Sequence, residues 1–78
     1  MPTVFRDRGV RYFFYSDEGD EPPHVHVERA GFTAKFWLRP VECAVNRGFS
    51  ERDIGRIARR VTAHLTLIEE AWHEHFDA

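Results

Sequence analysis

The sequence has little of several features that would assign it to a class at once. Its 78 residues include one cysteine, Cys43, so no disulfide can form within the chain. A small domain without disulfides is typical of a reducing compartment. No apolar run approaches the ~20 residues of a membrane-spanning helix, and the N-terminal residues do not resemble a signal peptide. We therefore expect a cytoplasmic protein that makes no membrane contact.

Motifs that reveal an activity by themselves are also missing. The sequence contains no glycine-rich phosphate loop, no CxxC pair and no GxSxG element. Cys43 lies in an apolar run, where a small buried side chain is expected rather than a nucleophile. His73 and His75 are two residues apart on an expected helix, so they should not chelate a metal together.

Charge is distributed unevenly along what we expect to be one domain spanning residues 1–78. The formal net charge is −2, but residues 17–28 carry five acids and no lysine or arginine, whereas residues 29–60 carry eight bases and three acids. Ten of the eleven bases are arginine, whose planar guanidinium suits phosphate and carboxylate groups. Such segregation favours a charged partner for one surface, while the near-neutral total argues against non-specific coating of DNA.

The order of patterns predicts an α+β fold, an antiparallel sheet of four to five strands packed by one long C-terminal amphipathic helix. Strands are expected at residues 3–6, 10–16, 24–29 and 32–38, and a bent strand continues to Val45 because Pro40 is tolerated only at an edge or a bulge. An acidic loop at residues 17–21 separates the second and third strands. Turns are expected at residues 7–9, 30–31 and 46–48.

The helix is predicted by apolar residues that recur every three or four positions from Ile54 to Phe76. Ser50 is placed to be its N-cap, with Asp53 at the third helical position. A helix of ~26 residues would be ~39 Å long, which is more than a small sheet can cover. Its last turns, with Trp72 and Phe76, should therefore project or pack against a second copy of the chain in a homodimer.

The most chemically suggestive stretch is His24-Val25-His26-Val27-Glu28, which follows two prolines. Side chains alternate between the faces of a strand, so His24, His26 and Glu28 should form a row on one face. If Ala30-Gly31 is a two-residue hairpin turn, His26 lies opposite Lys35 and His24 opposite Trp37. The other face is then entirely apolar, which supports this register.

Two functional interpretations of this face compete with a structural one. Two histidines and a glutamate are suitable ligands for Zn²⁺ or Fe²⁺, but a lysine ammonium beside His26 argues against a cation. Lys35 instead favours an anion, with His24 and His26 for proton transfer and Trp37 for stacking on a base. Tyr15, Glu28 and Arg39 are further candidates for binding. In the structural interpretation, these residues form only the solvated side of a small sheet.

Several stretches together resemble the small bacterial proteins grouped as domain of unknown function 4160. They are the aromatic second strand, Pro22–Val27, Ala34–Leu38 followed by Pro40-Val41, and Asn46-x-Gly48-Phe49-Ser50 opening a helix with a late tryptophan. The resemblance covers nearly the whole chain and implies a toxin–antitoxin-type component with a co-encoded small protein partner and an RNA target. It supplies no established activity. Its motif positions include His24, His26, Lys35 and Trp37.

Three functions follow as hypotheses. The first is an RNA-binding or phosphate-binding component of a toxin–antitoxin pair, in its strongest form a metal-independent endoribonuclease with His24, His26 and Lys35 as catalytic residues and no cofactor. The second is a non-enzymatic module that binds the co-encoded partner. The third is a histidine-based metal site. The sequence leaves open whether the protein is an enzyme.

Overall fold

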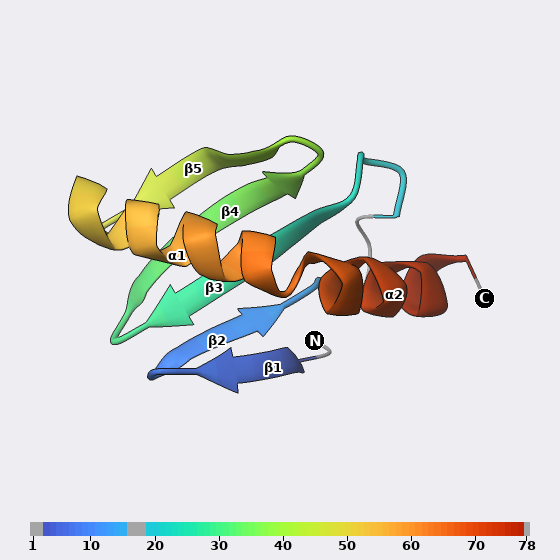
Figure 1. The fold of residues 1–78 in the computed structure, drawn as a ribbon, viewed down its shortest axis with the longest axis horizontal. Helices are drawn as coiled ribbons and strands as arrows, with labels where there is room; N and C mark the ends of the chain where they lie inside the picture. The colour runs from blue at the N-terminus through green and yellow to red at the C-terminus, as the bar shows by residue number, and fades with distance from the viewer. Residues whose placement is uncertain (1–2, 16–18, 78) are drawn as a thin grey trace.

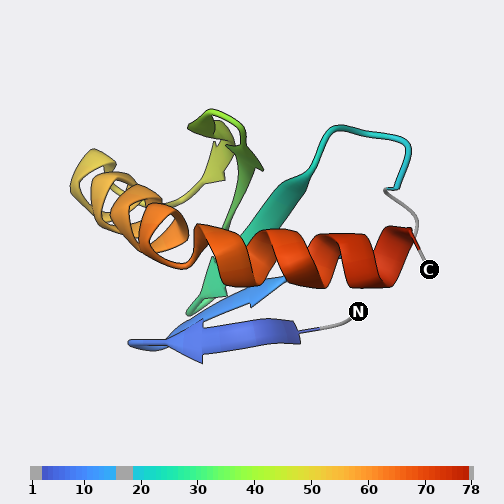
Figure 2. The ribbon, with the colours of Figure 1, turned by 45° about the vertical axis from the view of Figure 1, so that its right-hand side comes forward.

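The computed structural model describes residues 3–15 and 19–77 and confirms the α+β class. Five strands form one antiparallel sheet in the order β1-β2-β3-β4-β5. Both helices cover the same face of this sheet (Figures 1 and 2). The elements are β1 (Thr3–Asp7), β2 (Val10–Phe13), β3 (His24–Arg29), β4 (Phe32–Leu38), β5 (Val41–Arg47), α1 (Glu51–Ala63) and α2 (Leu65–Phe76).

The central hairpin has the register that the sequence predicts. His24 pairs with Trp37, His26 with Lys35 and Glu28 with Thr33. The turn between β3 and β4 has positive φ at both of its residues, 52° at Ala30 and 86° at Gly31. This is the backbone of a two-residue turn whose twist matches that of the flanking strands.

The core lies between the sheet and the helices. Val25, Val27 and Phe36 are completely buried on the face that the alternation predicts to be apolar. They pack with aromatic residues in and directly after β2 and with apolar residues of both helices. These residues are Tyr12 and Phe14, Ile57 and Val61 of α1, and Ile68 and Trp72 of α2. Removing each large side chain from water contributes about 1.5–3 kcal/mol, so this layer fixes the helices to one face and leaves the other face open.

The expectation of one long helix is wrong, because the helical segment breaks at His64. Its φ and ψ are −109° and 19°, and its backbone N–H donates to the carbonyl groups of Arg60 and Thr62. The break changes the direction of the chain between α1 and α2, as Figure 2 shows. Trp72 is consequently 3% exposed within its own chain, so this residue neither projects nor needs a second copy for its burial. A homodimer through the C-terminal helix stays a prediction.

Other boundaries differ less from the prediction. Ser50 caps α1 as expected, because its hydroxyl accepts a hydrogen bond from the backbone N–H of Asp53 at 3.1 Å. The second strand ends at Phe13 rather than Ser16. Ser16 lies outside the described residues, as do the first two residues of the predicted acidic loop. Neither helix in the described ranges is long and apolar enough to cross a membrane.

Candidate functional site

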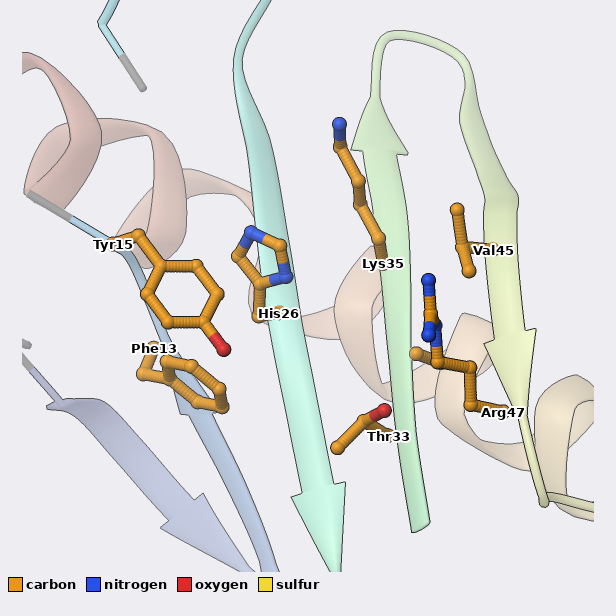
Figure 3. Close-up of a pocket in the computed structure, with 8 residues that line it drawn as sticks. Phe13, Tyr15, His26, Thr33, Lys35, Val45 and Arg47 are labelled. Carbon is orange, nitrogen blue, oxygen red and sulfur yellow. The ribbon is translucent and has the colours of Figure 1, made fainter. Parts of the chain in front are cut away.

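The open face of the sheet carries a cavity of about 380 Å³ on the side away from the helices (Figure 3). It exists because side chains on this face alternate with those of the core along β3 and β4. Figure 3 shows aromatic rings on one side of the cavity, His26 beside them, and Lys35 and Arg47 on the other side. The lining residues are Phe13, Tyr15, His26, Thr33, Ala34, Lys35, Val45 and Arg47.

The aromatic side of the cavity holds the imidazole of His26. The His26 ring centroid is 4.5 Å from that of Tyr15 in an edge-to-face arrangement and 5.6 Å from that of Phe13. Phe13 is buried, and the guanidinium carbon of Arg11 lies 4.1 Å from its ring centroid. Tyr15 is 39% exposed, so this ring is accessible to a ligand while its neighbours are held in place.

The cationic side contains Lys35 and Arg47. The Lys35 Nζ lies 2.6 Å from Glu21 Oε1 and 4.5 Å from the centroid of the Trp37 ring. Arg47 is exposed at the end of β5, opposite Thr33. Within residues 3–15 and 19–77, no carboxylate lies within ion-pair distance of Arg47. The cavity thus combines one paired cation, one exposed cation, an imidazole and an exposed aromatic ring.

His24 does not line this cavity. Its side chain is completely buried, and its Nδ1 donates to the carbonyl oxygen of Pro22 at 2.9 Å. Its ring lies 5.0 Å from that of Trp72, 5.1 Å from that of His26 and 5.7 Å from that of Trp37. The two histidines predicted to act together are therefore neighbours, but only His26 reaches the cavity.

The other predicted residues lie around the cavity rather than in it. Trp37 lines a separate hollow of about 210 Å³ with three prolines, Pro22, Pro23 and Pro40. Arg39 is directed to α2, where its Nε and Nη2 donate to the Glu69 carboxylate at 2.6 and 2.8 Å. These hydrogen bonds lower the pKa of Glu69. Glu28 is half-buried on β3 between its strand neighbours Arg11 and Thr33.

Sequence reasoning missed Arg47 and Val45 because it did not establish the register of β5. The pairing of β4 with β5 shifts between Lys35 and Phe36, which places Val45 opposite Lys35. Such a bulge inserts a residue and exchanges the faces on either side of it. Pro40 signalled an irregularity in this segment, but it gave no position for the shift.

The metal hypothesis receives no support from the arrangement of ligands. In the described part of the chain, no three His, Cys, Asp or Glu side chains are grouped so that they could hold an ion. Cys43 packs against the core, and its thiol donates to the Val45 carbonyl at a sulfur–oxygen distance of 3.3 Å. Burial raises the pKa of this thiol, so Cys43 is protonated at neutral pH and is a poor nucleophile.

The comparisons with known proteins identify a family and no activity. Residues 9–73 match the family described as domain of unknown function (DUF4160). No curated protein and no solved structure matches the chain. The match covers both central hairpin strands, β5, α1 and most of α2, as the resemblance in the sequence predicts. The chain therefore belongs to the DUF4160 family.

Proposed function

We propose that the open face of the sheet binds single-stranded RNA. The observation that carries this proposal is that Tyr15, His26, Lys35 and Arg47 line one cavity. Proteins that bind single strands combine a cationic surface for the phosphates with aromatic rings on which bases stack. The helices lie on the opposite face, apart from the contact of Trp72 with His24 at the start of β3, so an extended strand has access to the cavity across β2–β5.

Each side of the cavity has a separate role in this proposal. Arg47 and Lys35 contact phosphate oxygens, and Tyr15 provides the stacking surface. His26 is positioned by two aromatic rings, which directs its imidazole at the ligand as a hydrogen-bond partner. Phosphate contacts supply most of the affinity and make it fall with salt concentration, whereas stacking tolerates all bases.

RNA cleavage is the stronger form of the proposal and has less support. A metal-free cleavage through the 2′-hydroxyl needs a base and an acid at the scissile phosphate. The buried position of His24 leaves His26 as the one histidine that lines the cavity. Cleavage would then require a second group that carries a proton, and among the lining residues Lys35 is the candidate for this role.

A role in a toxin–antitoxin pair stays a proposal as well, and induced expression with and without the co-encoded partner tests it.

The binding proposal is tested by fluorescence anisotropy with a labelled single-stranded RNA at several salt concentrations. We expect Arg47→Gln to weaken binding about three- to tenfold and to reduce the slope of log K against log salt by about 0.7, which corresponds to one lost phosphate contact. Arg52→Gln is the matched control, since Arg52 is an exposed arginine of α1 and α1 lies over the covered face of the sheet. Equal affinities for wild type and both variants would refute the proposal. Capture of the co-encoded protein without RNA binding would favour the interaction-module hypothesis.

A further inference from the structure

A second basic site lies on the helix side of the molecule, away from the RNA-binding cavity. Four arginines line a hollow of about 540 Å³: Arg8 from the turn between β1 and β2, and Arg56, Arg59 and Arg60 from α1. Among the residues that the structure describes, no other residue type contributes to its lining. The three helical positions are spaced by three and four residues, so their side chains lie on one face of α1.

The charge of this hollow is only partly compensated. Arg60 Nε lies 2.9 Å from Asp7 Oδ2, an ion pair that ties α1 to the end of β1. The adjacent pair Arg29–Asp53, at 2.9 Å, is neutral overall. Arg8, Arg56 and Arg59 are exposed, and no carboxylate in the described ranges lies within 4.0 Å of their guanidinium nitrogens. Four guanidinium groups and one carboxylate leave a local charge of about +3.

Keeping these arginines together has a cost for the isolated chain. Like charges three or four residues apart destabilise a helix by roughly 0.2–0.5 kcal/mol per pair. A bound anion would remove this repulsion. The arginines converge on one hollow from two elements, which suits a compact anion with several charges better than an extended acidic chain.

We propose that Arg8, Arg56, Arg59 and Arg60 bind a terminal phosphate or diphosphate group. A phosphate monoester carries a charge of about −1.5 to −2 at pH 7 and has three acceptor oxygens. Guanidinium groups match phosphate oxygens in a bidentate geometry. Within residues 3–15 and 19–77 no aromatic ring lines the hollow, so it recognises the phosphate itself and not an attached base. This site does not depend on the RNA-binding cavity of the opposite face.

Two kinds of ligand carry such a terminal phosphate or diphosphate group: a nucleic acid with a 5′-phosphate and a free small diphosphate.

Calorimetric titration of the full chain with pyrophosphate tests the site. Arg59→Gln should weaken pyrophosphate binding about tenfold, whereas Arg39→Gln, which removes the same charge from an exposed arginine outside both sites, should change it less than twofold. Succinate, a dicarboxylate, should bind at least tenfold more weakly than pyrophosphate. Circular dichroism of each variant checks that the fold is intact.

A pair of RNAs that differ only in a 5′-phosphate or a 5′-hydroxyl identifies the source. If the 5′-phosphate strengthens binding and Arg59→Gln abolishes this gain, the ligand is a nucleic-acid end. If pyrophosphate binds and the two RNAs bind equally, the ligand is a free small phosphate compound. Absence of pyrophosphate binding, or equal weakening by Arg39→Gln and Arg59→Gln, would overturn the proposal.

Discussion

The ammonium group of Lys35 lies between two partners, 2.6 Å from the carboxylate of Glu21 and 4.5 Å from the centre of the Trp37 ring. The Glu21 carboxylate therefore forms an ion pair with a cation of the open face. It lies at the position where the proposed ligand would place a phosphate oxygen. The Lys35 side chain is 18% exposed and that of Glu21 is 40% exposed. The ion pair can thus exchange its carboxylate for a ligand without opening the core.

Removing the Glu21 charge should strengthen RNA binding. An ion pair this exposed contributes roughly 0.2–1 kcal/mol, so Glu21→Gln should lower the dissociation constant about 1.5- to 5-fold. Glu74→Gln removes the same charge from an exposed position of α2 and serves as the control. Anisotropy titrations in which the two variants have equal affinity would show that Glu21 does not compete with the ligand.

Substituting the two histidines should separate stability from binding. His24 is completely buried and hydrogen-bonded to Pro22, so His24→Ala leaves a cavity and a carbonyl without its donor. We expect a loss of about 2–4 kcal/mol in the free energy of unfolding, measured by urea denaturation. His26→Ala should cost less than about 1.5 kcal/mol and weaken RNA binding instead. The reverse pattern would restore His24 as a residue of the site.

Trp72 should matter for the stability of the monomer and not for association. It packs on Phe14, His24 and Phe76 within one chain. Trp72→Ala should lower the free energy of unfolding by about 3–5 kcal/mol, enough to unfold much of a domain this small. The milder Trp72→Phe keeps the fold measurable. We expect sedimentation to show the same oligomeric state for the wild type and for Trp72→Phe. If the wild type is a dimer and this substitution dissociates it, the intrachain role of Trp72 is contradicted.

Stability should also fall at alkaline pH because of Tyr12. Burial, followed by the nearby charge of Asp7, raises the pKa of its hydroxyl from 10.0 to about 12. The unfolded chain therefore loses this proton before the folded chain does, and stability that is complete below pH 10 decreases up to about pH 12. The loss is roughly 2–3 kcal/mol. Urea denaturation across this range should show a smaller decrease for Tyr12→Phe, and identical pH profiles would contradict the assignment.

The hairpin of β3 and β4 shows what the sequence contains about this fold. Alternation along residues 24–29 and 32–38, joined by Ala30-Gly31, was sufficient to predict both strands and their register. The N-cap Ser50 and the apolar spacing predicted where the helical segment begins and which residues it buries. These features depend on local backbone preference and on one hydrophobic face, and both are visible in a single sequence.

The break at His64 and the burial of His24 were not predictable in the same way. No proline or glycine occurs after Gly55, so no local signal marks the end of α1. The break is determined by tertiary packing, because α2 must turn for Trp72 to reach Phe14 and His24. Alternation assigned His24 to a face, but it could not show that Trp72 and Trp37 enclose that end of the strand.

The most direct test of the central claim is to map where RNA contacts the protein. Amide chemical shifts of isotopically labelled protein are followed by NMR during titration with a single-stranded RNA carrying a 5′-hydroxyl, which excludes the second phosphate site. We predict that the largest changes occur at Tyr15, His26, Lys35 and Arg47, with little change along α1 and α2. Changes confined to the helices, or none at RNA concentrations that saturate the anisotropy signal, would contradict binding at the open face of the sheet.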